Sequence, residues 1–165
     1  DLMKRKYLLS IVILVIIVIG FSIQIYNRNI QAHTVMSEVG FRNITYNIIQ
    51  LEGAIAFQMD NNWDEPSNVI EKVEDVVEGI FLTQKVGNDL RRLSTKDEEI
   101  LVRLKHYFEK LPEYSGFPNH EISEYEIRSF EELRRNLRDI GWGYNISYSN
   151  SWNELIEKAN HLMSK

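Results

Sequence analysis

Histidine and carboxylate side chains are the residues of this sequence that could do chemistry, because its 165 residues include no cysteine. The absence of thiols excludes a disulfide, a zinc–thiolate site and thiol redox chemistry. Two local groups could hold a metal ion, since histidine nitrogens and carboxylate oxygens are common ligands. These groups are His120 with Glu121 and Glu124, and Asp60 with Asp64 and Glu65.

Neither group has the spacing of an established metal-binding loop, and ordinary roles account for both. The carboxylates near Asp60 fit a turn with helix-capping residues, and His120 fits a solvated loop. The chain also lacks the G-x-x-x-x-G-K-[ST], G-x-S-x-G and H-E-x-x-H motifs and the EF-hand loop. We therefore expect no metal, no cofactor and no catalytic residues, and we predict that the protein is not an enzyme.

An apolar stretch at residues 7–26 reads YLLSIVILVIIVIGFSIQIY and contains no Asp, Glu, Lys or Arg. Twenty residues of helix span about 30 Å, the thickness of the hydrocarbon core of a bilayer. In lipid such a segment must be helical, because its backbone groups have no other partners. The stretch predicts a transmembrane signal anchor in contact with the lipid bilayer. A cleaved signal peptide is the alternative, with Gly20 and Ser22 as its small residues.

The basic residues Lys4, Arg5 and Lys6 stand directly before this stretch, which predicts a cytoplasmic N-terminus. Residues 1–6 then form a cytoplasmic stub, with the native chain expected to begin at Met3, and residues 27–165 form an extracytoplasmic domain. We accordingly predict a single-pass protein of the cell membrane. Gly20 and Gln24 lie one helical turn apart and are the candidates for packing against another membrane helix.

The net charge outside the anchor is strongly negative. The chain carries 19 basic and 24 acidic side chains, of which four basic ones and one acidic one lie in residues 1–28. Residues 29–165 therefore hold 15 basic and 23 acidic side chains, a net charge of −8. Such a domain is repelled by phosphate backbones, so we expect no nucleic-acid partner. An external domain without cysteine is also typical of a bacterial protein.

The remaining sequence predicts an all-α fold, in which the membrane helix continues to about residue 60 and leads into an antiparallel bundle of four to five helices. Apolar residues recur every three or four positions along each helix, the spacing of a helix with one buried face. Turn residues at 60–66 and the loop at 112–122 separate helices. The residues expected inside are Phe41, Ile44, Ile48, Leu51, Ile55, Val69, Val73, Val76, Val77, Ile80, Phe81, Thr83, Gly87, Leu90, Leu101, Leu104, Phe108, Leu111, Ile127, Phe130, Leu133, Leu137, Ile140, Trp152, Leu155, Ile156, Ala159 and Leu162.

Short motifs mark where helices begin, end and approach one another. Three capping boxes, each a Ser or Thr followed three residues later by Glu, start at Thr95, Ser123 and Ser151. Gly141 has the position of a glycine that ends a helix. The small residues at 53–56 predict a place where a second helix comes close.

The segment WGYNISYS at residues 142–149 departs from the helical pattern, because large apolar and small polar residues alternate. Period two is the pattern of a short extended segment with one buried face. Three interpretations remain open: a loop that lays its large side chains over the end of the bundle, a ribbon paired with residues 112–122, and an edge offered to a partner protein. The candidate interaction residues are Trp142, Tyr144, Ile146 and Tyr148.

These features predict a membrane-anchored helical protein that acts by protein–protein interaction, as a structural or regulatory subunit of a membrane complex. Its partner would be another membrane or extracytoplasmic protein, or a second copy of itself. One alternative is a ligand-sensing bundle that relays its signal through a partner membrane protein. The other is an immunity or inhibitor protein whose acidic surface meets a basic target.

Overall fold

A computed structural model describes residues 2–112 and 121–165 of the chain. Its contacts divide the chain into two compact units, Asp1–Val35 and Met36–Lys165. Over the described residues every regular element is helical, so the predicted all-α class is confirmed. The two units are described separately below.

The first unit consists of the greater part of helix α1 (Leu2–Gly40). Its apolar side chains are exposed throughout the 7–26 stretch, and the helix is long and apolar enough to cross a membrane. The hydroxyls of Ser10 and Ser22 donate to backbone carbonyls one turn earlier, so these polar groups are satisfied within the helix. Gly20 and Gln24 lie on its exposed surface.

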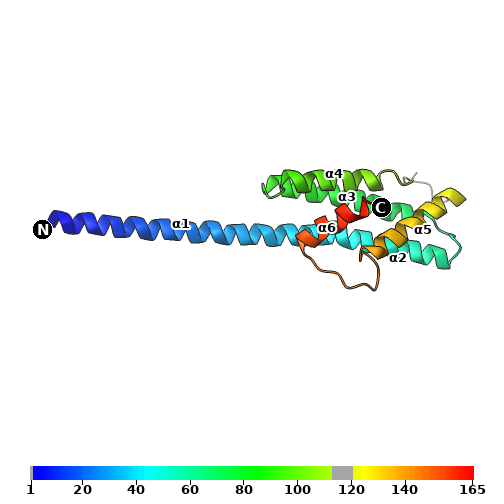
Figure 1. Cartoon of the computed structure of the whole chain (residues 1–165), viewed down its shortest axis with the longest axis horizontal. Helices are drawn as coiled ribbons and strands as arrows, with labels where there is room; N and C mark the ends of the chain where they lie inside the picture. Colours follow the sequence, from blue (N-terminus) through cyan, green and yellow to red (C-terminus); the bar gives the residue numbers. More distant parts are fainter. Residues whose placement is uncertain (1, 113–120) are drawn as a thin grey trace. The chain divides into compact units, whose positions relative to one another are not determined.

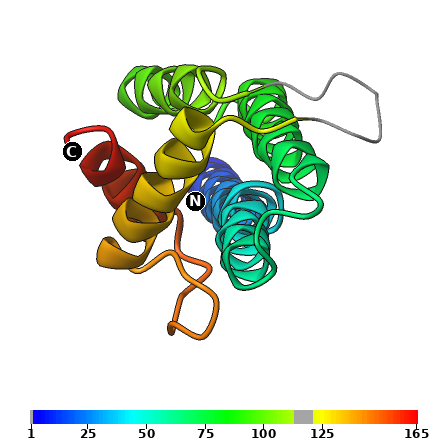
Figure 2. The same ribbon diagram turned by 90° about the vertical axis from the view of Figure 1, so that its right-hand side faces the viewer.

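The second unit is a bundle of five α-helices, in which successive helices run in alternating directions (Figure 1). Helix α2 packs on α3 and α5, and α4 packs on α3 and α6. The view along the bundle shows these helices around a shared interior (Figure 2). The elements are η1 (Phe41–Thr45), a π-helical turn, then α2 (Tyr46–Asp60), α3 (Ser67–Asp89), α4 (Thr95–Phe108), α5 (Glu124–Asp139) and α6 (Trp152–Leu162).

The apolar stripes identified in the sequence form the interior of this bundle. Most of the residues expected inside are buried, while Phe41, Val77, Leu111 and Ile127 are half-buried. Two expectations are wrong: Phe81 on α3 and Leu90, the residue that follows α3, are exposed. The buried apolar residues are Met36, Ile44, Ile48, Ile49, Leu51, Ile55, Val69, Ile70, Val73, Val76, Ile80, Ile100, Leu101, Leu104, Phe108, Phe130, Leu133, Leu137, Ile140, Trp142, Trp152, Leu155, Ile156, Ala159 and Leu162.

Helical structure is continuous from Met3 to Asp60, as expected, but it includes the π-helical turn η1. There the Tyr46 N–H donates to the carbonyl of Phe41, five residues back. The Asn47 side-chain amide donates to the carbonyl of Asn43 at 2.8 Å and to that of Asp75 on α3 at 2.9 Å. The Asn47 side chain, at the start of α2, therefore bridges the widened turn to α3.

Gly79 on α3 is the residue that lets the two helical segments meet. A Cβ at this position would lie 1.8 Å from the carbonyl oxygen of Asn43. At Gly53, within the small residues 53–56, the atoms nearest to an added Cβ belong to the Tyr144 side chain, at 3.7 Å, and not to a neighbouring helix. The close approach thus lies one helix further along the chain than the small-residue pattern suggests.

The helix ends follow the sequence motifs, with one shift of register. The expected box at Thr95 is wrong by one residue, because the Ser94 hydroxyl caps α4 by accepting from the Asp97 N–H. Ser123 forms a complete capping box with Glu126. Ser151 caps α6 by accepting from the Glu154 N–H.

Replacing Gly79 with alanine tests the close approach of α3 to η1. Because backbone atoms fill the space that the new methyl group needs, Gly79→Ala should destabilise the protein by about 1 to 3 kcal/mol. The matched control is Gly53→Ala, which meets no close atom and gains up to about 1 kcal/mol of helix propensity. Urea unfolding of the full chain in detergent, followed by tryptophan fluorescence, should rank the variants in this order. Equal urea midpoints for the two variants would refute the assignment of Gly79 as the point of close approach between α3 and η1.

Candidate interaction site

The α5–α6 loop (residues 140–151) contains the aromatic segment, and it begins with a Schellman helix end. Gly141 has φ +80°, a left-handed conformation that glycine adopts without strain. The Gly141 N–H donates to the carbonyl of Arg138 at 3.0 Å, and the Trp142 N–H donates to that of Leu137 at 2.8 Å. This reversal turns Trp142 back into the bundle, where only 1% of its surface is exposed.

A β-turn follows, so the expected extended segment at 142–149 is wrong over its first half. The Ile146 N–H donates to the carbonyl of Gly143 at 3.1 Å. Asn145, the third residue of the turn, has φ +70°, a left-handed conformation that asparagine tolerates better than most residues. A turn at 143–146 breaks the alternation of sides, and so the period-two pattern does not place these four side chains on one face.

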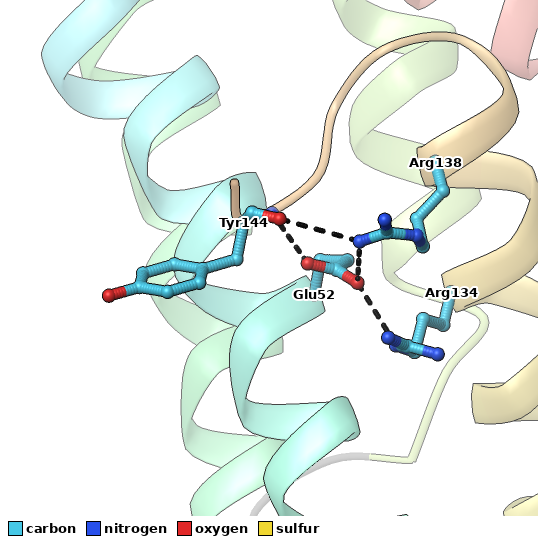
Figure 3. Close-up of polar contacts among 4 residues, drawn as sticks. All are labelled: Glu52, Arg134, Arg138 and Tyr144. Carbon is cyan, nitrogen blue, oxygen red and sulfur yellow. Dashed lines mark hydrogen bonds and ion pairs between the residues drawn. The ribbon is translucent and has the colours of Figure 1, made fainter. Parts of the chain in front are cut away.

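The turn is held against the bundle by the Glu52 cluster, which consists of Glu52, Arg134, Arg138 and the backbone of Tyr144 (Figure 3). The Glu52 carboxylate comes from α2, and its Oε1 lies 3.0 Å from Arg134 Nε and 3.0 Å from Arg138 Nη1. Its Oε2 accepts a 2.6 Å hydrogen bond from the Tyr144 N–H. Figure 3 shows the Tyr144 ring pointing away from both arginines.

Burial makes these contacts obligatory, because the Glu52 residue is fully inaccessible to water. A buried carboxylate without counter-charges costs several kcal/mol, and an isolated one would not be retained in an apolar interior. Arg134 and Arg138 stand one turn apart on α5, so both reach the same carboxylate. Both Glu52 oxygens are occupied by donors, and the cluster therefore positions the loop.

The far half of the loop is fixed by contacts to η1 and α6. The Tyr148 ring stacks on Phe41, with 5.6 Å between ring centroids. The Ser149 hydroxyl donates to the Glu154 carboxylate, which also lies 2.6 Å from Lys158 Nζ. The hydrogen bond from Lys158, and secondly that from Ser149, holds the pKa of Glu154 below its ordinary value. This end of the loop therefore keeps its charge pair at neutral pH.

Lys158 also joins the two ends of the loop. Its Nζ donates to the carbonyl of Gly141 at 3.1 Å while it pairs with Glu154. One α6 side chain thus binds the residue where the loop leaves α5 and also Glu154, the carboxylate that accepts from Ser149 near the other end of the loop. Together with the Glu52 cluster, these bonds preorganise the loop.

Preorganisation leaves two tyrosine rings at the surface. Tyr144 is 56% exposed and Tyr148 is 43% exposed. Tyr144 covers Gly53, and the exposed rings of Tyr46 and Phe57 lie seven residues before and four residues after Gly53 on α2. Positions at these spacings share one face of a helix. The loop and α2 therefore both carry exposed aromatic side chains, which together we call the aromatic face (Tyr46, Phe57, Tyr144 and Tyr148).

The structure separates the four candidate interaction residues. Tyr144 and Tyr148 are exposed, Ile146 is half-buried, and Trp142 belongs to the core. A ribbon between this segment and residues 112–122 is a prediction that falls largely on residues 113–120, outside the described residues. The same holds for His120 in the metal-ligand group. Within residues 2–112 and 121–165, no group of three His, Asp or Glu side chains is arranged to hold a metal ion.

Sequence reasoning did not identify Glu52, Arg134 or Arg138. A signal was present, since Glu52 stands four residues after Ile48 and three before Ile55, within an apolar stripe. A carboxylate at such a position indicates a buried partner. The partners themselves are not visible in the sequence, because they lie 82 and 86 residues away.

Comparisons with protein-family models, with curated proteins and with solved structures find no match for this chain. The geometry of the aromatic face and of the Glu52 cluster is therefore what supports an interpretation of the site.

A double-mutant cycle tests the role of charge in the Glu52 cluster. Replacing Arg134 and Arg138 with methionine leaves a buried carboxylate without counter-charge, which should cost about 3 to 5 kcal/mol of stability. Adding Glu52→Gln to that variant should restore more than half of the loss, because the amide is neutral and still accepts from Tyr144. Urea unfolding gives both values. If the triple variant were no more stable than the double variant, the unpaired charge of Glu52 would not be the cause of the lost stability.

Proposed function

We propose that this protein is a single-pass membrane protein whose helical bundle lies outside the cytoplasm and binds another protein through the aromatic face. The apolar part of α1 anchors the chain in the lipid bilayer, with its N-terminus in the cytoplasm. The bundle is then a structural or regulatory subunit of a membrane complex. The observation that carries this proposal is that exposed Tyr144 and Tyr148 are held in place, Tyr144 through its N–H on the buried Glu52 carboxylate and Tyr148 by stacking on Phe41.

Energetics favour an interaction role for these rings. Tyrosine is enriched at the centres of protein interfaces, because its ring buries a large apolar area and its hydroxyl retains a hydrogen bond. A loop already fixed in one conformation loses little entropy on binding. Tyr144 and Tyr148 each leave a large part of their surface in water, and a partner that covers them gains the burial of that surface.

A protein partner fits this face better than a small ligand does. A ligand pocket encloses most of its ligand, and it is lined by aromatic side chains that point inward. Here the large inward-pointing ring, that of Trp142, is already packed in the core, and the outward rings lie on α2 and its neighbouring loop. The aromatic face therefore resembles an interface surface.

The membrane topology can be tested because the chain contains no cysteine. A single cysteine introduced as Glu99→Cys, at an exposed position of α4, should react with a membrane-impermeant maleimide in intact cells. The matched control, Lys4→Cys, should react only after the cells are permeabilised. If only Lys4→Cys were labelled in intact cells, the topology would be the reverse of the one proposed. Recovery of the chain in the soluble fraction would contradict the proposed membrane anchor.

The interaction surface can be tested with Tyr144→Ala combined with Tyr148→Ala in the full chain. Loss of two exposed aromatic rings at an interface centre should weaken partner binding by about 2 kcal/mol or more, roughly 30-fold. Tyr125→Ala is the control, because Tyr125 is an exposed tyrosine of α5 outside the aromatic face. Co-purification from solubilised membranes, quantified by mass spectrometry, should lose one protein with the double variant and retain it with the control. Identical profiles for all three chains would reject the proposed surface.

A further inference from the structure

An apolar groove with an acidic rim lies between α3 and α4, apart from the residues of the aromatic face. Its floor consists of Val73, Val77, Phe108 and Leu111, and its volume is about 400 Å³. Figure 1 shows α3 and α4 as antiparallel neighbours along their length. A hollow of this size lies at the lower end of the range of ligand-binding pockets, and it suits one large side chain.

Exposed apolar surface extends this groove towards solvent. Phe81, which was expected in the core, instead lines the groove and is 54% exposed. The Phe81 ring therefore extends the apolar lining of the groove outside the bundle core. A large exposed ring that adjoins an apolar groove is typical of a binding surface.

The charges around the groove indicate what it would bind. Glu74 and Glu78 line it from α3, and they stand one turn apart, where like charges repel each other. The Lys105 charge on α4 is matched by Glu109, with 2.8 Å between Nζ and the carboxylate oxygen. The C-terminal end of α4, at Phe108, adds the partial negative charge of a helix dipole. Among the described residues that line the groove, three are therefore acidic and one is basic.

We propose that this groove binds a basic peptide segment of a partner protein, in which one large apolar side chain stands between lysine or arginine residues. The apolar side chain enters the groove between Val77 and Phe108, beside the ring of Phe81. The flanking cations lie over Glu74 and Glu78. This site goes beyond the proposed function, because it uses α3 and α4 and none of the residues of the aromatic face.

The test uses the full chain in nanodiscs of zwitterionic phosphatidylcholine and a fluorescent probe, the acetylated pentapeptide Lys-Lys-Trp-Lys-Lys. Fluorescence anisotropy measures its dissociation constant. The variant Glu74→Gln with Glu78→Gln should bind the probe about tenfold more weakly, as expected for two exposed charge pairs. The matched control, Glu99→Gln with Glu157→Gln, removes the same charge at exposed positions outside the groove and should bind within about twofold of the unchanged chain.

A second comparison tests the apolar part of the site. A probe with serine in place of tryptophan should bind at least about tenfold more weakly to the unchanged chain, since a buried aromatic side chain contributes 1.4 kcal/mol or more. Phe81→Ala should weaken binding of the tryptophan probe and leave that of the serine probe unchanged. Because Phe81 is exposed, this variant should melt at the same temperature as the unchanged chain.

Three results would overturn the proposal. The two charge variants losing affinity equally would mean that only the net charge attracts the probe. Equal binding of the tryptophan and serine probes would mean that the groove is not occupied. Competition by free tryptamine at the same concentration as the peptide would assign the groove to small amines. Variants of Tyr144 and Tyr148 leave this assay unchanged, so its outcome is independent of the aromatic face.

Discussion

The buried charge of Glu52 is the constraint on which the candidate site depends. A carboxylate removed from water needs hydrogen-bond donors for both oxygens and a positive charge to balance its negative charge. Glu52 finds them in two arginines of α5 and in the backbone of Tyr144. The position of α2 therefore fixes the rotation of α5 about its axis and the path of the chain that follows it. The loop, which has no regular structure, is thereby bonded to both α2 and α5.

The α5–α6 loop is held in one conformation by contacts of several kinds. Gly141 turns the chain through a left-handed conformation that ends α5, and Trp142 returns to the core. Lys158 of α6 then binds the carbonyl of Gly141, and the Tyr148 ring rests on Phe41 at the start of η1. Together with the Glu52 cluster, these contacts join the loop to η1, α2, α5 and α6. Exposed aromatic rings on such a support are ready for a partner without further ordering.

Close backbone approach determines the packing of α3 in a similar way. The π-helical turn η1 places the Asn43 carbonyl against Gly79, and the Asn47 amide bonds backbone carbonyls on both sides of the contact. A turn with one extra residue widens the helix and points a carbonyl outward. The position of α3 then leaves Phe81 and the Glu74–Glu78 face outside the core. The two proposed binding surfaces therefore follow from two internal constraints, one of charge and one of space.

Local rules made much of the fold predictable. Spacing of three and four identified most buried apolar positions, although Met36, Ile49, Ile70 and Ile100 were missed. The Ser123 capping box and Gly141 mark helix ends because their bonds join residues close in sequence. The same rules fail where local patterns compete. Ser94 rather than Thr95 caps α4, since both residues can accept the bond, and Phe81 continues a stripe that no neighbouring helix covers.

The candidate site was predictable only in part. The aromatic segment stood out by composition, and two of its four candidate residues are exposed. Its conformation was not predictable, because the period-two pattern gives no information on whether a second strand is available. Glu52 and its arginines meet across more than 80 residues of sequence, and no local pattern encodes such a distance.

The sequence by itself determined the helical class, the apolar helix long enough to cross a membrane and most of the buried faces, since each follows from the order of neighbouring side chains. Only the tertiary structure decided which carboxylate is buried, which glycine receives a neighbour and which aromatic rings remain in water. Those outcomes depend on residues that are distant in sequence and meet in space. There the free-energy cost of an unpaired buried charge or of overlapping atoms exceeds the conformational preference of any single residue.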